Sequence, residues 1–187
     1  DGNQAFARRS IASRLDEIRY MRVADVDGDG DADIVLAEKV ISWYENDGNQ
    51  GFTRHIVTDA IDSRRLRLTT CDLDGDGDLD VLGSTTDTGS GIAWFENDGN
   101  QTFTKHAIAS SGGPLHAADV DGDGDMDVLT ADGGGIVWYD NDGSQSFTKR
   151  TATNVTWDAN VVSTCDLDGD GDLDLLCGTR AGSGEYD

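Results

Sequence analysis

The apolar residues of this chain fall in short runs that alternate with polar positions and are separated by turn-forming residues. In the first third of the chain such runs lie at Met21–Asp25, Asp33–Ala37, Val40–Glu45 and Phe52–Val57. Short alternating runs bounded by Gly, Asn and Asp are typical of β-strands. No segment shows a convincing helical period of apolar residues. The pattern therefore predicts an all-β chain of short strands.

The same pattern recurs every 47 residues. The segment DVDGDGDAD begins at Asp25, and close copies begin at Asp72, Asp119 and Asp166. Between these copies lies a second motif, Trp-[Tyr/Phe]-[Glu/Asp]-Asn-Asp-Gly, whose last residues tolerate positive φ and predict a hairpin between the third and fourth strands. Four strands in a repeat of this length are typical of a β-propeller blade. We therefore expect a β-propeller, or a propeller portion, of about four four-stranded blades.

The chain is expected to form a single repeat domain over residues 1–187. Its expected parts are the fourth strand of an opening blade at 1–20, complete repeats at 21–67, 68–114 and 115–161, and an incomplete repeat at 162–187. Three interpretations stay open: a fragment of a larger propeller, a small self-closed propeller, or a subunit completed by neighbouring copies.

The charge is concentrated in the repeated Asp segments. The chain has 37 Asp and Glu against 14 Lys and Arg, a formal net charge of −23, and 20 of the acids lie in the four segments. Such acidity disfavours nucleic-acid phosphates and anionic membranes. No apolar run approaches the ~18 residues that a membrane helix needs. We expect neither a nucleic-acid partner nor membrane insertion.

Each Asp segment has the spacing of a loop that binds a hard cation. In the first copy, Asp25, Asp27, Asp29 and Asp33 occupy positions 1, 3, 5 and 9, and Asp31 at position 7 would offer its backbone carbonyl. This set of oxygen donors suits calcium better than magnesium, and the segment has no His or thiolate for zinc. Leu36 at position 12 and the β-like flanks exclude an EF-hand.

The sequence thus predicts about four structural calcium ions, one per loop, which would reduce the formal net charge from −23 to −15. The predicted metal residues are Asp25, Asp27, Asp29, Asp31, Asp33, Asp72, Asp74, Asp76, Asp78, Asp80, Asp119, Asp121, Asp123, Asp125, Asp127, Asp166, Asp168, Asp170, Asp172 and Asp174.

The Asp loops, the Trp motif and the Phe that follows it resemble the FG-GAP/VCBS repeat family, which includes the calcium-bearing blades of integrin α-subunits. The resemblance covers nearly the whole chain. It implies a β-propeller with calcium in the first loop of each blade, an extracellular setting, and a role in adhesion or ligand binding. Family propellers usually have about seven blades, and the Phe-Gly and Gly-Ala-Pro signatures are absent here.

One end of the blades is expected to carry variable loops. The distance from the first loop Asp to the Trp is 18, 22 and 19 residues in the three complete repeats, so the variation lies in the connections opposite the Asp loops. Variable loops on a rigid scaffold often bind ligands. There Trp157 either stacks on a sugar or partner, or fills a local gap. The nearby basic residues, among them Arg22, Arg67 and His116, either meet an anionic ligand or offset the Asp loops.

Three further features are the basic pairs of the fourth strand, the cysteines and the sequons. The basic pairs of the fourth strand, such as Arg54-His55, are interpreted as protection of an edge strand. Because every His occupies such a repeat position or a connection between strands, no catalytic arrangement of side chains is predicted.

Cys165 and Cys177 flank one loop and would form a disulfide only if they were cross-strand neighbours. Asn100 and Asn154 begin sequons and are possible glycosylation sites.

These observations leave three functions. The first is a calcium-stabilised extracellular module, secreted or on the cell surface, for adhesion or for binding a glycan or an extracellular protein. The second is a structural protein whose open blade edge joins copies into an oligomer or fibre. The third is the non-catalytic propeller part of a secreted carbohydrate-active enzyme. The chain itself is expected not to be an enzyme.

Overall fold

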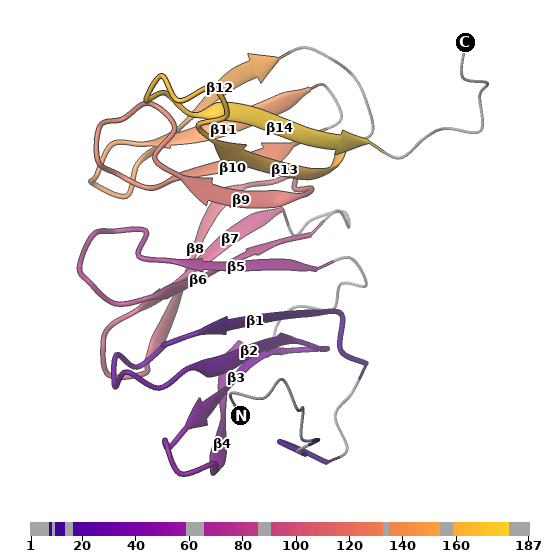
Figure 1. The fold of residues 1–187 in the computed structure, drawn as a ribbon, viewed down its shortest axis with the longest axis vertical. Coiled ribbons are helices and arrows are strands. Elements are labelled where there is room, and N and C mark those ends of the chain that lie inside the picture. Colours follow the sequence, from indigo (N-terminus) through magenta and orange to yellow (C-terminus); the bar gives the residue numbers. More distant parts are fainter. Residues whose placement is uncertain are drawn as a thin grey trace, which may run out of the picture.

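The computed structural model describes residues 8, 10–13, 17–58, 66–85, 91–132, 135–153 and 159–179. All regular elements in these ranges are β-strands, arranged as four antiparallel sheets that follow one another along the chain. Each sheet is one blade, and within a blade the strands lie in sequence order from inner to outer. The described sheets do not close into a ring (Figure 1).

The first three blades are complete and the described part of the fourth has two strands. Blade 1 comprises β1 (Tyr20–Ala24), β2 (Asp33–Ala37), β3 (Ile41–Asn46) and β4 (Phe52–Thr58). Blade 2 comprises β5 (Arg67–Cys71), β6 (Asp80–Ser84), β7 (Ile92–Asn97) and β8 (Phe103–Ala109). Blade 3 comprises β9 (Leu115–Ala118), β10 (Asp127–Ala131), β11 (Ile136–Asn141) and β12 (Phe147–Thr153). Blade 4 comprises β13 (Ala159–Cys165) and β14 (Asp174–Thr179).

The strands predicted for the first repeat are confirmed to within a residue. The expected strand at 1–20 falls largely outside the described residues, and the described residues 8 and 10–13 contain no strand. The inner strands β1, β5, β9 and β13 contact one another in succession, which places the blades side by side around their inner edges (Figure 1).

The hydrophobic core lies between the blades. Trp43 packs in a cluster that joins blades 1 and 2, and Trp94 packs in the equivalent cluster between blades 2 and 3. Both indoles are almost fully buried. Trp138 is only half-buried, because the described part of blade 4 offers two strands against it. The Trp that recurs in every complete repeat, expected from its repetition to be a core residue, therefore packs between blades.

A repeated side-chain hydrogen bond also connects neighbouring blades. The amide of Asn97 in blade 2 donates to the carbonyl of Val26 in blade 1, at 3.0 Å. Asn141 in blade 3 makes the same bond to Leu73 in blade 2, at 2.9 Å. Each Asn also donates to a carbonyl of its own blade. The Asn of the Trp motif thus ties each blade to the Asp loop of the preceding one.

The cysteines do not form the disulfide considered from the sequence. In the β13–β14 pair, Cys165 lies opposite Asp174 and Cys177 lies opposite Val162, so the two cysteines are not cross-strand neighbours. All three thiols, Cys71 included, are free. Burial, with nearby Asp80 and Asp72, raises the pKa of the Cys71 thiol to about 12, and Cys71 packs as a neutral thiol in the core between blades 2 and 3.

Among the described residues, the structure contains no helix with the length and apolar character that a membrane crossing requires.

Candidate metal centre

The Asp loop of each blade connects its first two strands and curls around the Asp at position 1. In the first loop the Asp25 carboxylate accepts a hydrogen bond from the Gly30 N–H at 3.0 Å. Gly28 and Gly30 have φ values of 72° and 93°, which a side chain would disfavour. The other loops repeat this bond from Gly77, Gly124 and Gly171. The glycines at positions 4 and 6 therefore allow the loop to close on its first carboxylate.

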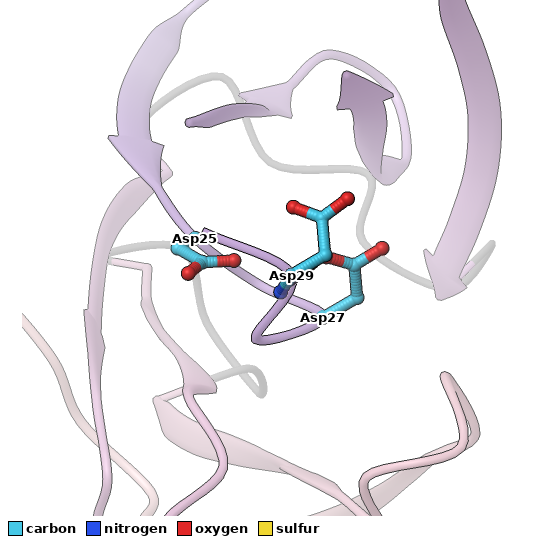
Figure 2. Close-up of side chains that lie close together, drawn as sticks. All are labelled: Asp25, Asp27 and Asp29. Carbon is cyan, nitrogen blue, oxygen red and sulfur yellow. Dashed lines mark hydrogen bonds between the residues drawn. The ribbon is translucent and has the colours of Figure 1, made fainter. Parts of the chain in front are cut away.

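Carboxylate oxygens converge inside each loop. In the first, one oxygen from each of Asp25, Asp27 and Asp29 lies within 4.8 Å of the others (Figure 2). In the other loops the corresponding groups join positions 1, 3 and 9, and their members are Asp72, Asp74 and Asp80; Asp119, Asp121 and Asp127; and Asp166, Asp168 and Asp174. Positions 1 and 3 come together in all four loops.

The donor set fits a hard divalent cation. Oxygen ligands from several carboxylates on a flexible loop are what calcium prefers. Within the described residues, Asp25 Oδ1 is buried and accepts no hydrogen bond. A buried carboxylate oxygen without a donor is costly, and a bound cation would remove that cost.

The Asp at position 9 has a second role, in holding the blade together. Asp80 is fully buried. One of its oxygens accepts from the Leu73 N–H of the loop at 2.9 Å, and the other accepts from the Asn97 N–H at the end of β7, at 2.8 Å. Asp33 and Asp127 repeat both bonds. This carboxylate therefore joins the loop to the turn between the third and fourth strands.

Burial raises the pKa of these carboxyl groups. It raises the pKa of Asp80 and that of Asp127 to about 6, and backbone hydrogen bonds oppose the shift only in part. Burial likewise raises the pKa of Asp33, Asp27 and Asp74. Neighbouring carboxylates add to each shift. A cation bound in the loop would favour the ionised forms.

The Asp side chain at position 7 of the loop contacts the turn between the third and fourth strands. The carboxylates of Asp31, Asp78 and Asp125 lie against Gly48, Gly99 and Gly143, where a Cβ would overlap them. The loop and the turn between the third and fourth strands thus share one end of the blade, as expected. The predicted metal residues that belong to none of the described oxygen clusters are Asp31, Asp33, Asp76, Asp78, Asp125, Asp170 and Asp172.

A family model for the FG-GAP-like repeat matches residues 25–83, 72–130 and 119–177. These matches begin at the first Asp of a loop and together span most of the chain. The chain belongs to the FG-GAP-like repeat family.

One solved structure similar to these FG-GAP-like repeats is a lectin from Agrocybe aegerita, described as showing specific recognition of non-reducing terminal N-acetylglucosamine. The TM-score is 0.65 at 22% sequence identity, and the match covers 84% of this chain and 46% of the lectin chain. The chain therefore spans about half the length of that lectin, and the likeness shows a shared fold. No curated protein matches the chain.

Each complete FG-GAP-like repeat also places an acid of its third strand beside the Asp loop, which sequence reasoning missed. Asp140 forms a further oxygen cluster with Asp121 and Asp123. Glu45 and Glu96 are close enough to the loops to contribute to the raised pKa of Asp27 and Asp74. In the sequence, this role could have been inferred from the acidic residue that recurs two positions after the Trp of each complete repeat.

These acids pair with the basic residues that were interpreted as edge protection. His55 bonds Glu45 at 2.7 Å and stacks on Trp43, with ring centroids 4.6 Å apart. His106 repeats both contacts with Glu96 and Trp94. Arg150 pairs with Asp140 and lies over Trp138. The basic residues therefore stabilise their own blade, in addition to lying on an edge strand.

The remaining predicted site residues are placed only in part. Trp157 and Asn154 lie outside the described residues. Asn100 is exposed in the turn after β7, where its amide donates to the Asp98 carbonyl at 3.0 Å. Its glycosylation stays a prediction.

Proposed function

We propose that this chain is a calcium-stabilised binding module that acts outside the cell and recognises a glycan. The observation that carries the proposal is the convergence of carboxylate oxygens in all four Asp loops, together with the buried, unpartnered Oδ1 of Asp25. Repulsion within such clusters must be offset when the blades form. Calcium binding would therefore be coupled to folding.

The proposed setting follows from the kind of site. The loops are short, exposed along most of their length, and built from carboxylates of one segment. Extracellular calcium modules work at dissociation constants of about 10⁻⁴–10⁻³ M, which suits the calcium level outside cells. A structural calcium ion in every blade would therefore be bound in a secreted or cell-surface protein, where a role in adhesion or ligand binding would also apply.

The proposed ligand class draws on the fold and on the variable loops. The Agrocybe aegerita lectin shares the fold and recognises a terminal sugar, which supports a glycan as the first ligand to test. The connections opposite the Asp loops differ in length between repeats, as expected of a recognition surface. Trp157 in one of these connections would offer a stacking face for a sugar ring.

Calcium titration and glycan binding test the two parts of this proposal separately. Thermal melting in chelator, in magnesium and in millimolar calcium should give the highest midpoint in calcium. A glycan array probed in calcium should then give defined hits that Trp157→Ala weakens without lowering the midpoint. Equal midpoints in calcium and chelator would refute the metal part, and an array without hits would refute the glycan part.

A second candidate function is assembly through blade 4. Within the described residues, β14 pairs only with β13, so one edge of this sheet carries no partner strand. Val161, Leu167, Leu175 and Leu176 of this blade are exposed. An open edge beside exposed apolar side chains is a surface on which another strand can pair. Copies of this chain are the partner that this function requires.

A further inference from the structure

The inner strands of all four blades line one pocket. Its volume is about 220 Å³, and its walls include Tyr20, Arg22, Arg67, His116, Asn160 and Ser163. These residues come from β1, β5, β9 and β13, which are the innermost strands of successive blades. The pocket is therefore built by the arrangement of the blades, and no single repeat contains it.

Two guanidinium groups gather around one aromatic ring in this pocket. Arg22 lies over the Tyr20 ring, 4.7 Å from its centroid, and donates a hydrogen bond to the Tyr20 hydroxyl at 3.0 Å. Arg67 lies 5.9 Å from the same centroid. The ring thus holds both cations in place through cation–π contacts.

No carboxylate in the described part of the chain forms an ion pair with either arginine. Among the described residues, the ion pairs use Arg54, His55, His106, Lys149 and Arg150, and none uses Arg22 or Arg67. This is notable in a chain with 37 acids and 14 Lys and Arg. In the described residues these arginines therefore make no direct ion pair with the Asp loops, whose charge they could offset only from a distance. Two like charges beside one ring favour an anion between them.

The other polar groups of the pocket are neutral hydrogen-bonding partners. His116 Nε2 lies 3.1 Å from Thr164 Oγ1 of the neighbouring inner strand. Burial, and then the charge of Arg22, lower the pKa of His116, so its ring is mainly uncharged at neutral pH. Asn160 and Ser163 add side chains that can both donate and accept. The positive charge of the pocket therefore comes from the two guanidinium groups.

We propose that this pocket binds the carboxylate of a small acidic sugar, of the hexuronic acid class, between Arg22 and Arg67. A guanidinium matches a planar carboxylate with two parallel hydrogen bonds, which ammonium groups cannot do. The pocket is small for a drug-sized ligand and has room for one sugar ring. Its neutral polar groups suit sugar hydroxyls. The choice of a sugar rests on the proposed glycan-binding function.

The test is titration of the calcium-loaded protein with glucuronic acid, followed by NMR or calorimetry. Glucose, which lacks the carboxylate, should bind at least ten-fold more weakly. Arg67→Gln should lower glucuronic acid affinity roughly ten-fold or more, as expected for the loss of a charge-assisted hydrogen bond. Arg22→Gln should have a similar effect, and thermal melting checks that each variant is folded.

The matched control is Lys105→Gln, which removes the same charge from the exposed edge of β8. It should leave glucuronic acid binding unchanged. Equal binding of glucose and glucuronic acid, or equal loss in all three variants, would overturn the proposal. Acetate binding as tight as that of glucuronic acid would overturn the assignment to a sugar. The glycan array decides the wider function independently, because neutral glycans bound elsewhere would still register there.

Discussion

At the scale of single residues, the Asp at position 9 carries two kinds of role. The spacing of the Asp residues in each loop predicted that the Asp at position 9 binds the metal. In three blades one of its carboxylate oxygens does lie in the carboxylate cluster. Its two backbone hydrogen bonds were not predictable, because one donor, the Asn97 N–H, lies 17 residues away along the chain. A repeated motif shows which residues recur, but it does not show which of them form hydrogen bonds with one another.

We predict that Asp80→Asn destabilises the calcium-loaded protein by about 1–3 kcal/mol. An amide offers one acceptor oxygen, and its NH₂ group would face the second N–H donor in a fully buried site. Urea unfolding in calcium measures the change. Asp98→Asn is the matched control, because a single oxygen of this exposed Asp accepts both of its hydrogen bonds. Equal stability of the two variants would contradict the structural role of Asp80.

At the scale of elements, strand positions were predictable to within a residue, since alternation, the Asp loops and the Asn-Asp-Gly turn mark the strand ends. The hydrogen bonds between blades were not predictable. The Asn of the turn was read as a turn former, whereas the amides of Asn97 and Asn141 also reach a carbonyl of the preceding blade. The accepting carbonyl belongs to a different repeat, so no pattern within one repeat predicts this hydrogen bond.

We predict that Asn97→Ala lowers the free energy of unfolding by about 1–3 kcal/mol, because the carbonyls of Val26 and Leu79 lose their donor. Asn46→Ala should cost less. The described hydrogen bond of the Asn46 amide goes only to Ala32 of its own blade, at a more exposed site. Urea unfolding of both variants in calcium tests the difference. Equal losses would show that the bond between blades adds nothing.

At the scale of the whole molecule, exposed apolar residues gather on blade 4. Val161, Leu175 and Leu176 lie on the β13–β14 sheet, which the described strands leave with an open edge, and Leu167 lies in the adjoining Asp loop. The sequence predicted the incomplete fourth repeat. The sequence singled out Arg22, Arg67 and His116 as basic residues that could meet an anionic ligand. It did not indicate the pocket that they share with Tyr20, because these residues belong to three different repeats.

If blade 4 mediates assembly, the mass of the calcium-loaded protein should rise with concentration in light scattering. Leu176→Lys should then shift the protein towards the monomer, since it places a charge on the exposed β14 strand. Ile56→Lys on β4 is the matched control, because Ile56 is exposed to a similar degree in a blade with four strands. A concentration-independent monomeric mass in calcium, or the same effect from both variants, would exclude assembly through this sheet.

The Asn bond between blades also has a consequence for how such chains change length in evolution. Blades 1 and 2 present the same carbonyl to the blade that follows, and blades 2 and 3 present the same amide to the blade that precedes. Removal of 47 residues from Asp72 to Ala118 would bring the Asn141 turn against the Val26 loop, where the same donor and acceptor meet. Duplication of a repeat would restore the contact in the same way. Blade number can therefore change in whole units without a new interface having to arise.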